Sequence, residues 1–170
     1  CNSIILINSR KTNNRVDCVD QLNPKEITSM TNKNRTVDLT QFLPDTSSDL
    51  PSDFVTDGVT CYRDAYGIPH IKANNLKDAF FGQGFFTAQD RLFQMDMDRR
   101  KAYGRMSELI GPAGLVTDRL MRKFKIAESV KGDYEVLNEE TRVMLTDYAA
   151  GVNAFIKSTA VPSAEYALLD

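Results

Sequence analysis

The chain has 170 residues, with 21 Lys and Arg against 23 Asp and Glu and 42% hydrophobic residues, enough for one domain with a real core. The net charge of -2 and the lack of a Lys/Arg stripe interleaved with aromatic residues argue against nucleic-acid binding. The sequence contains no run of about 18 apolar residues that would predict a transmembrane segment.

Residues 1–57 differ in composition from the rest of the chain. They are rich in Asn, Thr, Ser and Asp and show neither a helix period nor a strand period. We expect a polar leader or linker that is mostly extended, followed by a domain part at residues 58–170. Leu39, Phe42 and Leu43 form an apolar group that could dock on that domain. Because the chain does not begin with Met, we expect a processed chain or a fragment.

Cys1 is open to three interpretations. It could be an N-terminal nucleophile whose own α-amine serves as base, the lipid-modified cysteine of a bacterial lipoprotein, or simply the residue at which the numbering begins. Cys1, Cys18 and Cys61 cannot all pair with one another, and no two of them have the spacing of a metal site. Their pairing state and the redox compartment therefore stay open.

A β-hairpin is predicted at residues 59–71. Residues 59–63 are β-branched and aromatic, as in a half-buried strand. The segment Asp64-Ala65-Tyr66-Gly67 fits a type I turn, with Asp first to accept backbone N–H groups and Gly last to take a positive φ. Pro69 removes an N–H from the return strand, which we therefore expect at a sheet edge.

A long helix is predicted next, up to the break at Gly111-Pro112-Ala113-Gly114. Gly82, Gly84 and Gly104 would each cost such a helix roughly 1 kcal/mol relative to Ala, so we expect another backbone to approach closely there. The apolar side chains recur at three- and four-residue steps: Phe81, Phe85, Ala88, Leu92, Met95, Ala102, Met106 and Leu109.

Two further helices are predicted. Thr117 is the expected N-cap of a second helix, which carries Asp118 in its first turn, an apolar face with Leu120, Phe124 and Ala127, and a solvated basic face. Asn138 is the expected N-cap of a third helix. The apolar residues of the third helix should pack on the long helix: Leu145, Tyr148, Ala149, Val152, Phe155 and Ile156.

Side chains with catalytic potential are few. His70 is the single histidine, which excludes a two-histidine metal site, and we expect its ring to be packed or hydrogen-bonded at the sheet edge. Asp90-Arg91 is expected to make structural ion pairs, and Asp96 should pair with Arg99 and Arg100. The carboxylate pairs Asp96/Asp98 and Glu139/Glu140 lack the spacing that brings two groups together, so we expect them to be solvated.

Several motifs carry a family resemblance. Their order and spacing resemble the start of the penicillin acylase family of N-terminal nucleophile hydrolases. The likeness continues through Asp118, Arg122 and residues 148–156, and covers roughly the last two-thirds of the chain. The motifs are Arg63-Asp-Ala-Tyr-Gly-Ile-Pro-His-Ile71, Gly82-Gln-Gly84, Ala88-Gln-Asp-Arg-Leu-Phe-Gln-Met95, Arg99-Arg100, Gly104-Arg105 and Glu108-Leu-Ile-Gly111.

The resemblance implies an α+β fold, in which a mainly helical segment with an N-terminal β-hairpin forms part of a four-layer αββα sandwich. Members of this family are made as a precursor, or zymogen, that cuts itself into an α chain and a β chain. The nucleophile is the serine at the start of the β chain, whose α-amine is the base. The resemblance implies the same reaction here, hydrolysis of a non-peptide amide such as a β-lactam side-chain amide, an acyl-homoserine lactone or an acylated lipopeptide.

This chain resembles the N-terminal part of the α chain. The implied partners are the β chain of the same precursor and a small-molecule amide substrate, and the implied location is periplasmic or secreted, with lipid anchoring through Cys1 as an alternative. The family's acyl-pocket residues and the acidic ligand of its calcium site come after the point matching Asp170. We therefore assign no catalytic, cofactor-binding or metal residue in this chain.

Two rival functions stay open at this point. A non-catalytic, truncated scaffold could act as a binding protein, and a stand-alone hydrolase could use Cys1. Because a segment that packs against a large partner chain should expose apolar faces when alone, we expect this chain to aggregate or stay partly unfolded without the β chain.

Overall fold

The computed structural model describes residues 3–8, 29–32, 35–43, 50–51, 53–160 and 163–169, among which no helix is long and apolar enough to cross a membrane. Cys1 and Cys18 lie outside these residues. The elements in chain order are β1 (Ser3–Asn8), β2 (Ser29–Asn32), β3 (Arg35–Asp38), η1 (Leu39–Phe42), β4 (Leu50–Pro51), β5 (Val59–Arg63), β6 (Pro69–Ala73), α1 (Leu76–Ala102), α2 (Ser107–Ile110), η2 (Gly111–Gly114), α3 (Leu115–Phe124), α4 (Ile126–Val136), α5 (Glu139–Ser158) and α6 (Ala164–Leu169).

A four-stranded sheet has the order β4-β1-β5-β6, and β2 pairs with β3 in a second, two-stranded sheet. β1 runs antiparallel to β5, with Ile5 opposite Cys61. The prediction of a mostly extended linker over residues 1–57 did not include β1, β2, β3, η1 and β4. β1 pairs with β4 and β5, which are distant along the chain, so a local period could not reveal it. β2 and β3 pair with each other as a local hairpin, which the sequence analysis missed. In η1, Leu39 and Phe42 are half-buried, whereas Leu43 is exposed.

The hairpin between β5 and β6 confirms the predicted turn. The Gly67 N–H donates to the Asp64 carbonyl at 3.0 Å, and Gly67 has a φ of 77°. One Asp64 carboxylate oxygen accepts the N–H groups of Tyr66 and Ile68, at 2.9 and 3.0 Å. β6, which begins at Pro69, is an edge strand of the four-stranded sheet, as the missing N–H predicted.

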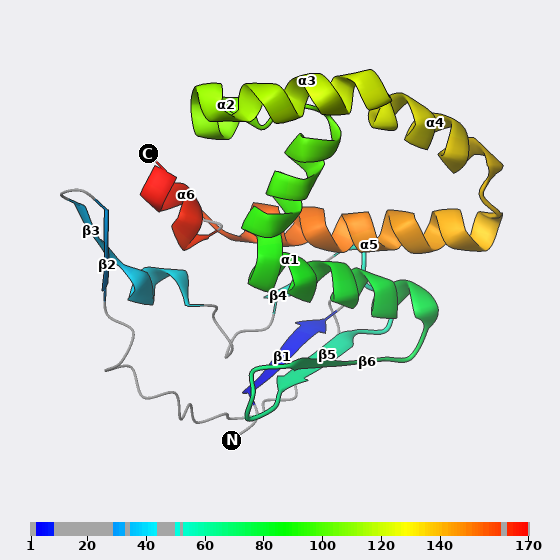
Figure 1. The fold of residues 1–170 in the computed structure, drawn as a ribbon. Coiled ribbons are helices and arrows are strands. Elements are labelled where there is room, and N and C mark those ends of the chain that lie inside the picture. The colour runs from blue at the N-terminus through cyan, green and yellow to red at the C-terminus, as the bar shows by residue number, and fades with distance from the viewer. Residues whose placement is uncertain are drawn as a thin grey trace.

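The core lies between the sheet and α5, with α1 in the middle (Figure 1). The N-cap side chain of Asn75 accepts the Asp78 N–H at 2.8 Å, which starts α1 directly after β6. Val59 and Cys61 of β5 meet the aromatic face of α1 from one side, and Phe155 of α5 meets it from the other. The buried apolar residues of α1 are Phe81, Phe85, Phe86, Ala88 and Leu92.

Glycines allow α1 and α5 to touch backbone to backbone. A Cβ on Gly84 would overlap the Tyr148 carbonyl oxygen, and a Cβ on Gly151 would overlap the Phe81 carbonyl oxygen. The predicted close approach at Gly84 is thus confirmed. At Gly82 the close neighbour is the Val59 side chain, 2.7 Å from the position of a Cβ, rather than a backbone.

The long helix is shorter and less regular than predicted. It is kinked at Arg91, where φ is -139° and ψ is 18°, and it ends at Ala102 instead of continuing to residue 110. Gly104, with a φ of 61°, turns the chain there, and the Arg105 N–H still donates to the Arg100 carbonyl at 2.8 Å, as at a helix end of the Schellman type. The apolar spacing that runs on to Leu109 concealed this end, although the glycine is a local signal for it.

The remaining helices partly follow the prediction. α3 begins at Leu115, so Thr117 lies inside it and is not its N-cap. Asn138 does cap α5, and its side chain accepts the Thr141 N–H at 2.8 Å. A left-handed residue, Lys125 with a φ of 55°, separates α3 from α4, a helix not anticipated from the sequence. α2, α3 and α4 run above α5, between the C-terminal half of α1 at one end and the start of α5 at the other (Figure 1).

Candidate functional site

His70 is part of the hairpin surface. Its Nε2 lies 3.1 Å from the Asp64 carboxylate, and its ring stacks on Tyr62 with 4.6 Å between centroids and 5° between planes. The hydrogen bond with His70 is the main cause that lowers the Asp64 pKa. The prediction of a packed, hydrogen-bonded ring at the sheet edge is confirmed, and the histidine is not set beside a nucleophile.

Arg63 joins the hairpin to α1. Its guanidinium donates to the Gly67 carbonyl at 2.8 Å, to Gln89 at 2.7 Å and to both oxygens of Asp90, at 2.7 and 3.0 Å. Asp90 therefore makes the structural ion pair that was predicted, while Arg91 is exposed at the kink of α1. These groups hold the hairpin in place. In the same strand, burial raises the pKa of the free thiol of Cys61 to about 11. The thiol therefore stays protonated near neutral pH and is a poor nucleophile.

Asp96 lies at the centre of a polar network where α1 meets α6. It accepts hydrogen bonds from Arg99 at 2.7 Å, Arg100 at 2.8 Å and the Tyr166 hydroxyl at 3.1 Å. Burial acts to raise its pKa, but these hydrogen bonds outweigh burial and lower it. The pairing with the two arginines is confirmed, and the expectation that Asp96 is solvated is wrong. Asp98, Glu139 and Glu140 are exposed.

Two buried carboxylates hold loops, and neither was singled out as a site in the sequence. Asp78, fully buried, accepts the N–H groups of Thr56 at 2.9 Å and Asp57 at 2.8 Å. Asp118, which is 4% exposed, accepts the N–H groups of Met106 at 2.7 Å and Ser107 at 2.9 Å, together with the Ser107 hydroxyl. Burial acts to raise the Asp118 pKa, but these hydrogen bonds outweigh it and lower the pKa.

Metal binding finds no support in the part of the chain whose side chains are described. Within residues 38–43, 53–160 and 163–168, no three His, Cys, Asp or Glu side chains gather as a ligand set. The carboxylates of Asp78 and Asp118 already accept backbone N–H groups, so they are not arranged for a cation. The resemblance assigned no calcium ligand to this chain, and the calcium ion that it implies stays a prediction.

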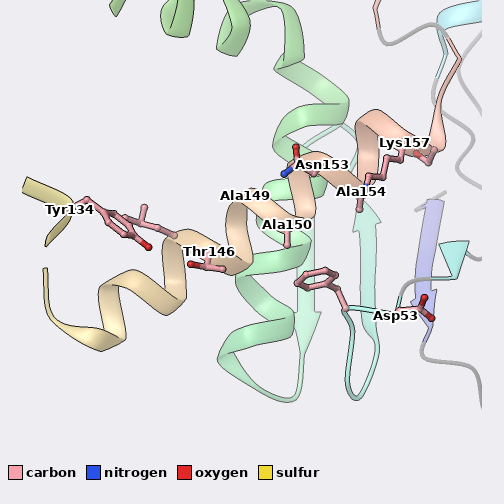
Figure 2. Close-up of a pocket in the computed structure, with 11 residues that line it drawn as sticks. Asp53, Tyr134, Thr146, Ala149, Ala150, Asn153, Ala154 and Lys157 are labelled. Carbon is pink, nitrogen blue, oxygen red and sulfur yellow. The ribbon is translucent and has the colours of Figure 1, made fainter. Parts of the chain in front are cut away.

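A groove of about 930 Å³ runs along the outer face of α5 (Figure 2). Figure 2 shows Tyr134 at one end and Asp53 and Lys157 at the other, with small side chains between them. Leu145, Ala149 and Ile156 are exposed on α5, although the sequence predicted that they pack on α1. The groove residues are Asp53, Phe54, Tyr134, Leu145, Thr146, Ala149, Ala150, Asn153, Ala154, Lys157 and Ser158.

The hydroxyl groups of this groove are committed to the helix that carries them. Thr146 donates to the Arg142 carbonyl at 2.8 Å, and Ser158 donates to the Phe155 carbonyl at 2.8 Å. Since His70 lies on the hairpin, no imidazole is present to activate them. The groove therefore offers small apolar side chains along α5, and its hydroxyl groups are already engaged within that helix.

Comparison with known proteins decides the family. Residues 58–170 match the family described as Penicillin amidase. This chain belongs to that family. The finding confirms the resemblance seen in the motifs between Arg63 and Gly111.

Curated members of the penicillin amidase family are similar to the chain over a small share of their own length. The penicillin acylase 2 proenzyme of Pseudomonas sp. (strain SE83) is 44% identical over 127 residues, 75% of this chain and 16% of that protein. Penicillin G acylase of Escherichia coli is 39% identical over 94 residues, which are 55% of this chain and 11% of that protein. The acyl-homoserine lactone acylase QuiP of Pseudomonas aeruginosa (strain PAO1) is 35% identical over 114 residues, which are 67% of this chain and 14% of that protein.

A solved member of the family has a similar fold. The thermostable penicillin G acylase from Alcaligenes faecalis matches with a TM-score of 0.59 and 33% identity, over 66% of this chain and 62% of the solved chain. Because these two shares are nearly equal, the solved chain is of comparable length to this one. The curated relatives, by contrast, are several times longer than the segment that they share with it.

Proposed function

We propose that this chain is the α-chain portion of an amidohydrolase that cleaves a non-peptide amide, with the catalytic serine at the start of a separate β chain of the same precursor. The observation that carries the proposal is the family match over residues 58–170. The single histidine of this segment lies on the hairpin, where it is bonded to Asp64, and we propose that the remainder of the precursor supplies the nucleophile.

The lengths of the relatives support a division into two chains. The shared segment makes up 11% of the curated Escherichia coli penicillin G acylase but 62% of one chain in the solved Alcaligenes faecalis enzyme. A short separate chain within a much longer protein is what self-cleavage of a precursor produces. In the assembled enzyme, the sheet of β1, β4, β5 and β6 with α1 and α5 would form one part of the four-layer αββα sandwich.

The names of the relatives support the substrate class. Those similar to this chain are penicillin acylases and acyl-homoserine lactone acylases. Both names imply an acyl group on the nitrogen of an amide, so we propose an N-acyl amide of a small ring-bearing amine as the substrate. We further propose that the protein acts in the periplasm or outside the cell, and that any calcium ion is bound outside the described part of this chain.

The test uses the full gene product that contains this chain. Intact masses and N-terminal sequencing of every copurifying chain should reveal a partner of several hundred residues that begins with Ser. The preparation should hydrolyse penicillin G or an N-acyl-homoserine lactone, and replacement of that serine by Ala should abolish the activity. A preparation that hydrolyses neither amide and contains no second chain would contradict the proposal and favour a non-catalytic binding scaffold.

A further inference from the structure

α3 is anchored through one of its faces. Asp118 and Arg122, one helical turn apart, both point to the junction of α1 and α2. Asp118 accepts the N–H groups of Met106 and Ser107, and the Arg122 Nε donates to the Gly104 carbonyl at 2.9 Å. These contacts fix the rotation of α3 about its own axis, so they also fix which residues point away from the junction.

The opposite face of α3 is apolar and exposed. Val116, Leu120 and Phe124 are 79%, 49% and 61% exposed. At about 100° per residue, they lie between roughly 160° and 240° around the helix from Asp118. Exposed apolar residues are ordinary when scattered singly. Three at four-residue steps on one face are the pattern of a helix that packs on a core, and in the described part of the chain that face has no such core.

We propose that this apolar face of α3, formed by Val116, Leu120 and Phe124, is a docking surface for the β chain of the same precursor; the inference rests on the function proposed above. The length of the relatives argues for this occupant, because 84% of the penicillin acylase 2 proenzyme lies outside the 16% that it shares with this chain. The exposed cations Arg119 and Lys123 border the face on one side. The docked surface of the β chain should therefore be apolar with an acidic rim.

The first experiment identifies what covers the face. A photo-crosslinking phenylalanine analogue is placed at position 124 of the full gene product, and another at position 76 as a control, since Leu76 is 67% exposed at the start of α1. Irradiation should join position 124 to the β chain, as judged by mass spectrometry of the crosslinked peptide. A crosslink from position 124 to a second copy of this chain, or no crosslink while a β chain is present, would overturn the inference.

The second experiment measures the effect of the face on assembly. The double variant Leu120→Glu, Phe124→Glu should reduce the β chain that copurifies with this chain by about tenfold or more, because charges would have to be buried in an apolar contact. Leu76→Glu is the matched control and should leave the ratio of the two chains unchanged. Equal losses in both variants would overturn the assignment to α3. Absence of any β chain from the wild-type preparation would instead contradict the proposed function as well.

Discussion

The α1–α5 pair and the α3–α4 segment use apolar residues in opposite ways. α1 and α5 bury theirs, approach each other through Gly84 and Gly151, and lie in the middle of the fold. α3 and α4 expose many of theirs, and α3 is held at the junction of α1 and α2 by polar contacts of Asp118. The first pair can be understood from this chain alone. The second segment is the one for which we propose a docking surface on the β chain.

The largest effect is expected from a change in the packing of α1 on α5. Gly84→Ala should lower the free energy of unfolding by about 3 kcal/mol, because the added Cβ overlaps the Tyr148 carbonyl oxygen and forces two helix backbones apart. Urea unfolding of the assembled protein measures it. The control is Gly132→Ala in α4, where a Cβ meets no described atom within 4 Å, and this variant should gain about 1 kcal/mol. Similar effects at both glycines would contradict the difference between the two regions.

The next effect concerns the anchor of α3. Asp118→Asn should lower the melting temperature by several degrees. The carboxylate accepts three hydrogen bonds through its two oxygens, whereas an asparagine keeps one acceptor oxygen and places an NH₂ donor where the other oxygen was. The folded-state pKa of Asp118 is lowered, so its stabilising contribution is complete above the unfolded pKa and is lost as the pH falls through the folded value. Melting curves of both proteins should therefore converge in acid. If the difference in melting temperature between the two proteins grew as the pH fell, it would contradict a stabilising role of the Asp118 carboxylate.

Asp147 on α5 should behave in the opposite way. It is 6% exposed, and its Oδ2 has no hydrogen-bond partner among the described residues, so burial raises its pKa. A raised folded-state pKa means that stability is lost as the pH rises through that value. Asp147→Asn should therefore increase the free energy of unfolding at neutral pH by about 1–2 kcal/mol. The gain should shrink in acid, and urea unfolding at two pH values measures it; no gain at neutral pH would show that the carboxylate is better satisfied than its contacts indicate.

The smallest expected effect lies at the joint between the two regions. Asn138→Ala removes the side-chain acceptor of the Thr141 N–H at the start of α5, and should cost about 1 kcal/mol. Asn138→Ser keeps a capping oxygen and should recover most of that loss. Thermal melts of the three proteins test it. If Ser proved no better than Ala, the cap would contribute little here and tertiary packing alone would hold the N-terminus of α5.

The features that were predicted correctly depend on neighbours in the sequence. Asp64, Gly67 and Pro69 determine the turn and the edge strand through their own hydrogen-bonding and φ preferences, and Asn138 caps the helix that follows it. The His70 environment also followed from its place beside Pro69 in an edge strand. In each case the deciding physical contact is within a few residues, so the local pattern contains it.

The features that were missed depend on distant partners. Asp118 accepts N–H groups 11 and 12 residues away, a contact that local spacing does not reveal. Asp78 does the same for N–H groups 21 and 22 residues earlier. The groove along α5 depends on the positions of Phe54 and Tyr134, which local spacing does not determine. A buried aspartate near a helix start was the available signal, and it is ambiguous without the fold.

The backbone contact between α1 and α5 has a consequence for the evolution of the chain. Gly84 meets Tyr148, and Gly151 meets Phe81, so the two helices must cross in one register. One residue inserted between Tyr148 and Gly151 would turn the rest of α5 by about 100° and replace the glycine at the crossing by a larger residue. Lineages of this protein can therefore exchange the side chains on the outer face of α5, but they should conserve the number of residues between these contact points.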